Sequence, residues 1–471
     1  MTGTLTSRDW RFGALTALLA LYGAGVVLFP PSVVLNSDEA LYIRQAVAYA
    51  SGQTSVEVRN PETWNVSRVL PSMYPPGTSL LQTPFVRARG WAAACWASVL
   101  ALGVLMFVTA AWLRRLDLRP TFAALIPMFL PVAVLGRTGM SDLPGAAVVV
   151  SSLFLLTRAP ERNPIAGGGF LAGLSLAFRD SNLIFIVPTI MKCVLRRERV
   201  ILLAAAIVLG VSVRLGLAAL LQGNALTLRT PYVFTLSGAA GRAVLYGFAL
   251  TLLVPGGLVA VGLYRGPGRA LILASVGTPF LFFTLYSYFG QYSGFLRSLV
   301  LGPRYIIPLV PLAAIALASL VEGHVPQEKQ KRRLELLILA AAAIVTCAVH
   351  PVLHAWSERQ ATLVRALYDQ TSPEATLVTE PGATAKYLNG LYGQRVLTDR
   401  LLYPPGKLRP LLAHGPVQLV FIDRSDSEYW RALAKMNEQY LTSVAESCEL
   451  KLRVDLTSID RLRVVDVVKC H

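Results

Sequence analysis

The chain has 471 residues, of which 54% are hydrophobic and only 15% are charged. A soluble protein of this length carries about 25% charged residues, so the composition excludes an ordinary soluble enzyme. The net charge of +17 is spread over short segments between apolar blocks rather than gathered in one patch. This distribution is typical of membrane orientation signals and excludes a nucleic-acid partner.

Long apolar blocks follow one another through the first three quarters of the chain. Such blocks cross a hydrocarbon core of about 30 Å, and inside lipid they must be helical because only a helix satisfies its own backbone. The sequence predicts about eleven spans in the lipid bilayer: 12–29, 91–113, 120–136, 142–157, 165–178, 181–195, 200–221, 242–264, 270–289, 304–321 and 334–354. The two short spans around Arg179 and Asp180 could instead form one broken helix.

The first block resembles a signal peptide, but it lacks a small-residue cleavage site and ends in Phe29-Pro30-Pro31. We therefore interpret it as a retained first helix. Loop charge then sets the orientation, because basic residues concentrate on the cytoplasmic side of a membrane. With eleven spans, one side of the membrane receives the basic segments: Arg8 and Arg11, Arg114 to Arg119, Arg158 and Arg162, Lys192 to Arg199, Arg265 and Arg269, and Lys329 to Arg333.

This pattern predicts a multi-pass protein of the cytoplasmic (inner) membrane with a cytoplasmic N-terminus. The opposite, extracytoplasmic side receives the loop 31–90 and the C-terminal region. Within that loop, Ala40 to Ser51 has apolar residues on one helical face, so we expect an amphipathic helix along the membrane surface. A second such segment, Ser79 to Arg89, follows Tyr74-Pro75-Pro76-Gly77.

The sequence divides into a transmembrane domain, 1–355, and a soluble extracytoplasmic domain, 356–471. Apolar runs in the second part shorten to strand length, at Thr376 to Thr379, Gln394 to Leu397 and Val417 to Ile422. Helical stretches at 383–389, 406–413 and 427–440 separate them, and two strand-like runs, 448–455 and 460–469, end the chain. The alternation predicts a small α/β domain.

Cys448 and Cys470 bracket the final hairpin at nearly mirror positions. An oxidising outer compartment would allow them to form a disulfide, although two free thiols remain open. The sequence has no CxxC pair, P-loop, GxGxxG or histidine cluster. It therefore predicts no zinc, nucleotide or flavin cofactor.

Asp38 and Glu39 are adjacent carboxylates on the outer side. Such a pair can provide a general base and a cation-binding group, but Ser37-Asp38-Glu39 can equally cap a helix. Asp142 lies between two apolar blocks on the same side, where it could also cap a helix or face a cavity.

Several arginines accompany these carboxylates. Arg179 and Asp180 interrupt an apolar stretch and could pair with each other or line the same cavity. Arg304 and Tyr305 open the tenth span; this arginine could bind a phosphate through two hydrogen bonds, or the two residues could anchor a helix end at the interface. Two further phosphate-binding candidates are Arg214 and Arg297.

At these residues the chain resembles the GT-C glycosyltransferases of the protein-mannosyltransferase and aminoarabinose-transferase type, which use polyprenyl-phosphate sugars. The resemblance covers about residues 10–320 and rests on four segments: Ser37 to Tyr42, Tyr74 to Gly77, Arg137 to Asp142, and Arg304-Tyr305 with Pro308 and Pro311. Many relatives have a lysine where this chain has Tyr74, so one charge expected at that loop is missing.

The resemblance implies an inverting membrane glycosyltransferase that acts on the extracytoplasmic face. Asp38 would be the general base toward an acceptor hydroxyl or amine, Glu39 would assist it, and Asp142 would support the acceptor or metal site. Arg304, with Tyr305, Arg179, Arg214 and Arg297 as further candidates, would hold the lipid phosphate, while Tyr74 and Arg137 would belong to the acceptor side.

The sequence leaves open a divalent cation, Mg²⁺ or Mn²⁺, bound by the three carboxylates. It also leaves open which sugar moves and whether the acceptor is a lipid, a glycan or a protein. The alternative function is a transporter or flippase of lipid-linked glycans, which would have paired repeats and ionisable residues near mid-membrane. A catalytically inactive scaffold would tolerate the loss of Asp38.

Overall fold

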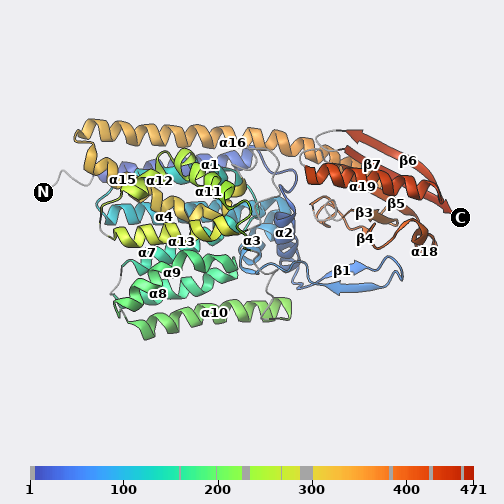
Figure 1. Ribbon diagram of the computed structural model, residues 1–471, viewed down its shortest axis with the longest axis horizontal. Helices are drawn as coiled ribbons and strands as arrows, with labels where there is room; N and C mark the ends of the chain where they lie inside the picture. Colours follow the sequence, from blue (N-terminus) through green and yellow to red (C-terminus); the bar gives the residue numbers. More distant parts are fainter. Residues whose placement is uncertain are drawn as a thin grey trace.

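The computed structural model describes residues 6–158, 161–197, 199–224, 234–266, 268–286, 301–380, 386–423, 428–457 and 461–471. The molecule is elongated, with a helical bundle at one end and a small α/β domain at the other (Figure 1). One long helix, α16 (Glu328–Gln370), runs along the bundle and continues into the α/β domain. The boundary predicted at 355–356 therefore falls inside a continuous helix.

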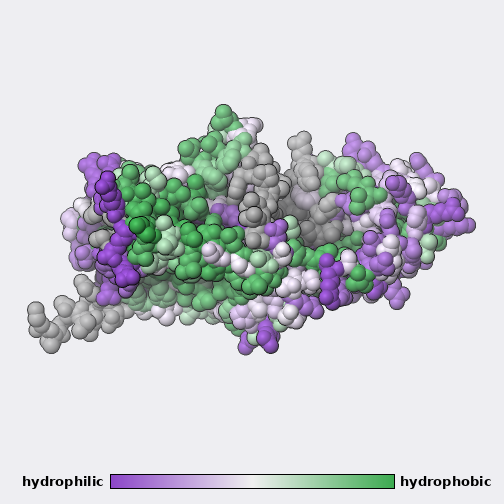
Figure 2. Space-filling view, turned by 90° about the horizontal axis from the view of Figure 1, so that it is seen from below, coloured by the Kyte–Doolittle hydropathy of each residue, from purple (hydrophilic) through white to green (hydrophobic). Residues whose placement is uncertain are grey.

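Apolar helices dominate the bundle. Among the described residues, five helices are long and apolar enough to cross a membrane: Trp10–Leu28, Trp91–Arg115, Val200–Gln222, Gly302–His324 and Glu328–Gln370. A bent pair with a 93° angle, Ala239–Leu253 and Gly257–Leu263, could add a sixth span. Figure 2 shows an apolar band over the bundle between two hydrophilic ends, as expected for a polytopic membrane protein. The number eleven stays a prediction.

The helices of the bundle differ in length, and several are short or broken. They are α1 (Thr6–Leu28), α4 (Trp96–Arg115), α7 (Asp142–Leu156), α8 (Arg162–Leu174), α9 (Leu183–Leu195), α10 (Val200–Gln222), α11 (Ala239–Phe248), α12 (Gly257–Leu263), α13 (Arg269–Leu285) and α15 (Val310–His324). Short 3-10 turns flank several of them: η1 (Trp91–Cys95), η3 (Ser175–Ala177), η4 (Asp180–Asn182) and η7 (Gly302–Leu309). A π-helical turn, η5 (Ala249–Leu253), follows α11.

The span predicted at 120–136 is not one helix. It forms η2 (Pro120–Ala124), α5 (Leu125–Met128) and α6 (Leu130–Leu135). Pro127 and Pro131 lack the N–H that a continuous helix needs at those positions. Because surrounding protein buries nearly all of this segment, its irregular backbone does not face lipid.

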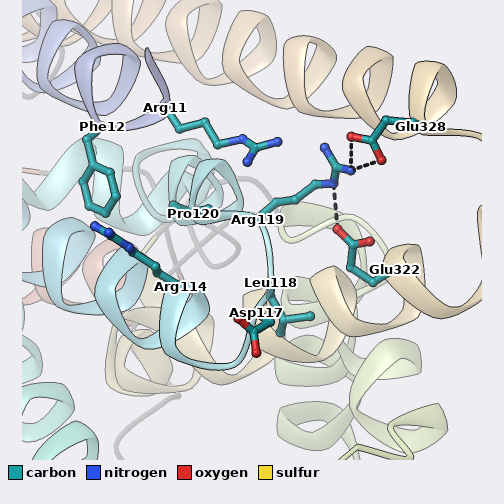
Figure 3. Close-up of a pocket in the computed structure, with 9 residues that line it drawn as sticks. All are labelled: Arg11, Phe12, Arg114, Asp117, Leu118, Arg119, Pro120, Glu322 and Glu328. Atoms are coloured by element: carbon teal, nitrogen blue, oxygen red, sulfur yellow. Dashed lines mark hydrogen bonds and ion pairs between the residues drawn. The ribbon is translucent and has the colours of Figure 1, made fainter. Parts of the chain in front are cut away.

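An ion-pair cluster fixes α16 at the end of the bundle near the N-terminus, beside a cavity of about 330 Å³ (Figure 3). The buried Arg119 donates to Glu322 at 2.7 Å and to Glu328 at 2.6 Å. Glu335, fully buried on α16, accepts from Arg119 at 3.0 Å and pairs with Arg11 at 2.9 Å. The cluster joins α1, η2, α15 and α16, so we assign it to the architecture.

The outer loop folds into α2 (Ser37–Ala50), a hairpin of β1 (Val56–Arg59) and β2 (Val66–Val69), and α3 (Gly77–Arg89). Both predicted helices are present. Ile43 and Ala46 of α2 pack with Val86 of α3, and half of the residues of α2 are buried in protein. The apolar residues of α2 meet other parts of the chain, and the helix lies between the bundle and the α/β domain (Figure 1). That α2 lies along the membrane surface stays a prediction.

The α/β domain contains a five-stranded sheet in the order β4-β3-β5-β7-β6. Its elements are β3 (Thr376–Thr379), β4 (Val396–Asp399), η8 (Pro405–Lys407), α18 (Leu408–Leu412), β5 (Val417–Asp423), α19 (Glu428–Ala445), β6 (Cys448–Thr457) and β7 (Arg461–Cys470). The β3–β4 and β3–β5 pairs are parallel, and β7 runs antiparallel to β5 and β6. Each predicted strand has a counterpart, whereas the helix expected at 383–389 lies partly outside the described residues.

Two layers of side chains cover the sheet. Leu363 and Leu367, from the C-terminal part of α16, pack in one core with Leu377. Val444 of α19 packs in a second core with Leu419. Cys448 and Cys470 form a disulfide that joins the paired ends of β6 and β7.

Candidate active site

Asp38 lies in the first turn of α2, at the boundary between the bundle and the α/β domain. The N-cap is Asn36, whose side chain accepts a hydrogen bond from the Glu39 N–H at 2.9 Å. Since Asn36 caps the helix, Asp38 does not have to. Its carboxylate still benefits from the positive end of the helix dipole.

Tyr74 and Arg304 both contact the Asp38 carboxylate. The Tyr74 hydroxyl donates to one oxygen at 2.5 Å, and the Arg304 guanidinium approaches the other at 3.3 Å. The Arg304 side chain is only 2% exposed, whereas that of Asp38 is 16% exposed. The base candidate is thus the more accessible member of this pair.

Arg304 begins a chain of contacts that reaches Asp142. It donates to the Tyr305 hydroxyl at 3.0 Å, with its guanidinium carbon 5.0 Å from the centre of that ring. The Arg179 guanidinium carbon lies 4.6 Å from the same ring. Arg179 in turn donates to one oxygen of the fully buried Asp142 at 2.6 Å. Two guanidinium groups therefore lie beside one phenol, with an aspartate at each end.

Broken helices bring these side chains together. Arg304 and Tyr305 lie in η7, whose residues are all buried and which contains Pro303 and Pro308. Arg179 has extended backbone, with φ −164° and ψ 128°, between η3 and η4. Non-helical backbone at membrane depth is tolerated where it is buried in protein or lines a polar cavity. The polar interruption between the two short predicted spans thus supplies Arg179 to the site.

The loop that carries Tyr74 is fixed by groups that the sequence did not suggest. The Tyr74 carbonyl accepts from Gln222 at 2.7 Å and from Gln45 at 3.5 Å. The Tyr74 ring stacks on Tyr42 with the ring centres 4.4 Å apart. Glutamine is seldom buried, and Gln45 lies among the apolar residues of an amphipathic segment. Its position was the feature of the sequence that could have indicated this contact.

Glu39 has a different environment from its neighbour Asp38. Its carboxylate accepts backbone N–H groups of Leu35 and of Gly139, the latter at 2.7 Å. Burial raises the pKa of Glu39 to about 7, although these backbone donors oppose the rise. Glu39 therefore clamps the start of α2 to the turn before Asp142, which does not fit the catalytic or metal-binding role expected of it.

Arg137 and Arg214 also bind elsewhere. Arg137 is buried and donates to the carbonyls of Phe29 and His350, so it ties the C-terminal end of α1 to α16 rather than facing an acceptor. Arg214 pairs with Asp180 at 3.4 Å. The alternative in which Arg179 pairs with Asp180 is therefore wrong, because Arg179 pairs with Asp142. Arg297 lies outside the described residues.

The three carboxylates do not fit a shared divalent cation. No group of three or more histidine, cysteine, aspartate or glutamate side chains in the described residues is arranged to hold a metal ion. The oxygens of Glu39 accept backbone N–H groups, and those of Asp38 face Tyr74 and Arg304. Asp142 gives one oxygen to Arg179.

Comparison with known proteins identifies the fold. No family model matches the chain, and no curated protein matches it in sequence. The crystal structure of ArnT from Cupriavidus metallidurans bound to undecaprenyl phosphate matches with a TM-score of 0.63 and 13% identity over 98% of both chains. The chain has the GT-C fold.

The apo structure of the same ArnT matches this GT-C chain with a TM-score of 0.59 and 14% identity, again over 98% of both chains. The arabinofuranosyltransferase AftD from Mycobacteria has a TM-score of 0.49 and 14% identity, over 98% of this chain and 40% of that one. The ArnT match spans both the bundle and the α/β domain, so the whole chain follows one architecture.

Proposed function

We propose that the protein is an integral membrane glycosyltransferase. It transfers a sugar from a polyprenyl-phosphate donor to an acceptor hydroxyl or amine on the extracytoplasmic face. The observation that carries the proposal is the contact chain from Asp38 through Arg304, Tyr305 and Arg179 to Asp142. The bound undecaprenyl phosphate of ArnT supports a lipid phosphate as the donor's anchor.

The two arginines suit a leaving phosphate. Arg304 and Arg179 flank Tyr305, so a phosphate at this ring would receive charge-assisted hydrogen bonds from two guanidinium groups. Asp142 keeps Arg179 in place through its 2.6 Å bond. Its second carboxylate oxygen is buried and has no hydrogen-bond partner among the described residues, so it can accept a bond from substrate.

Asp38 is the base in this proposal. It removes the proton from the acceptor hydroxyl while the acceptor oxygen attacks the anomeric carbon. The bond from that carbon to the phosphate oxygen breaks, and its electron pair stays on the departing polyprenyl phosphate. Arg304 and Arg179 stabilise the charge that develops on this oxygen. Attack opposite the leaving group inverts the anomeric configuration.

Tyr74 prepares Asp38 for this step. Its hydroxyl donates to the oxygen that does not contact Arg304, so the carboxylate is held from two sides. An acceptor hydroxyl can replace Tyr74 at that oxygen or approach its other lone pair. The stack on Tyr42 and the fixed carbonyl limit how far Tyr74 can move.

The experiment that tests the function is transfer from radiolabelled polyprenyl-phosphate sugars to membrane extracts, with wild type and Asp38→Asn compared. Transfer by the wild type alone supports the proposal and identifies the sugar. No transfer from any donor by intact protein contradicts it and favours a transporter or flippase of lipid-linked glycans.

A further inference from the structure

A second cavity lies on the outer side of the chain, away from the Asp38–Arg304 pair. Its volume is about 450 Å³, within the range of about 300–1,000 Å³ typical of small-molecule sites. It is a groove between the extramembrane part of α16 and the beginning of the outer loop. Trp91 and Tyr392 complete its wall.

Aromatic rings form one continuous side of the groove. Trp91 and Tyr392 meet edge to face with ring centres 5.4 Å apart, and Tyr368 contacts Tyr392 at 6.1 Å. The hydroxyl of Tyr392 accepts from the Val34 N–H at 2.8 Å, and that of Tyr368 bonds the Gly393 carbonyl at 3.2 Å. These bonds fix the rings before any ligand arrives, which lowers the entropy cost of binding.

Charged side chains of α16 form the opposite side. Glu358 and Arg365 pair at 3.4 Å and are both exposed. Asp369 is exposed one turn further along and has no hydrogen-bond or ion-pair partner within the described part of the chain. Two negative charges and one positive charge line the groove, so its net charge of −1 disfavours a phosphate or an anionic lipid headgroup.

A sugar matches both sides of this groove. The carbon-bound hydrogens on one face of a pyranose or furanose ring pack on aromatic rings, and its hydroxyls donate to carboxylates and accept from a guanidinium. We infer that the groove is an acceptor-binding subsite that takes neutral sugar residues of a glycan. This inference rests on the proposed glycosyltransferase function.

The groove is placed to serve the same acceptor as Asp38. Val33 lines it, and Asp38 follows five residues later. Five residues span at most about 18 Å, so an oligosaccharide held in the groove can extend to the catalytic carboxylate. The acceptor class is therefore a glycan chain rather than a single small molecule.

The test is saturation-transfer difference NMR on the full-length protein in detergent, with irradiation of aromatic protons. The probes are neutral trisaccharides of mannose, glucose, galactose and arabinose. We expect transfer to the carbon-bound protons of at least one trisaccharide. Asp369→Ala and Trp91→Leu should weaken its binding by about tenfold, the effect of losing one strong contact at an interface.

Glu374→Ala is the matched control, because Glu374 is an exposed carboxylate of the same domain that does not line the groove. Asp369 is exposed, so its variant tests the groove even if Trp91→Leu fails to fold. Saturation transfer to no trisaccharide, or saturation transfer that is unchanged in Asp369→Ala, overturns the inference. Saturation transfer to short-chain phosphatidylglycerol, but to no trisaccharide, also overturns it.

Failure of the inference and of the proposed function can be distinguished. If wild type transfers sugar from the lipid donor but binds no trisaccharide, the groove assignment is wrong and the function stands. If it binds a trisaccharide through Asp369 but transfers no sugar, the groove binds glycan and the proposed function is wrong. Where both hold, Asp369→Ala raises KM for the glycan acceptor about tenfold and leaves KM for the donor unchanged.

Discussion

Replacing Asp38 by asparagine removes the proposed base with almost no change of shape. The asparagine oxygen can still accept the bond from Tyr74, which is 2.5 Å long in the wild type. Its amide NH₂, however, points two donor hydrogens at Arg304, where the carboxylate oxygen lay 3.3 Å from the guanidinium. The variant therefore loses both the proton acceptor and one ion pair, and Arg304 keeps its bond to the Tyr305 hydroxyl.

The expected loss of activity can be worked from these contacts. A positioned general base contributes about 10²–10⁴ in rate, or about 3–5 kcal/mol of transition-state stabilisation. A hydrogen bond to a charged group contributes about 1.5–3 kcal/mol to stability. We expect kcat to fall at least about 100-fold, with the variant still folded and inserted. The assay is initial-rate transfer from a radiolabelled polyprenyl-phosphate sugar, with the melting temperature measured on the same preparation.

Glu39→Gln is the matched control, since it neutralises the adjacent carboxylate on the same helix. Glutamine keeps one carbonyl oxygen but turns an amide toward one of the two backbone N–H donors of Leu35 and Gly139. Its melting temperature should therefore change more than its kcat. Turnover within threefold of wild type in Asp38→Asn, or loss of turnover only in Glu39→Gln, would refute the assigned roles.

Four further outcomes follow from the geometry. The pKa of Glu39 is raised from 4.5 to about 7, so its contribution to stability is complete below pH 4.5 and is lost as the pH rises through 7. The loss is about 3 kcal/mol. Melting temperatures measured across this pH range should fall accordingly, and Glu39→Gln should flatten the dependence. Arg304→Ala should raise KM for the lipid donor, and an unchanged KM would move the phosphate site elsewhere. Glu335→Ala should cost about 3 kcal/mol because it leaves the buried Arg119 and the half-buried Arg11 without a shared carboxylate, and an unaltered melting temperature would contradict this. Cys448 and Cys470 should resist thiol labelling until they are reduced, whereas prompt labelling without reductant would exclude the disulfide in the native protein.

The sequence singled out several residues that the structure places together, while their catalytic roles stay predictions. Asp38 was selected as one of two adjacent carboxylates, Asp142 and the Arg304-Tyr305 pair as polar residues beside apolar blocks, and Tyr74 through the family resemblance. The structure brings them into one chain of contacts. The roles of Glu39 and Arg137 could not be predicted. Their partners are backbone groups of residues far away in sequence, and no side-chain pattern records them.

The sequence by itself determined the class of molecule. Apolar blocks and basic loops depend on transfer of each segment between water and lipid, which is a local property. The strands of the α/β domain were found for the same reason, since alternation and length are also local. The tertiary structure alone decided which arginine pairs with which aspartate. Arg179 pairs with Asp142 rather than with its neighbour Asp180, because the broken helices set the distances between charges that lie far apart along the chain.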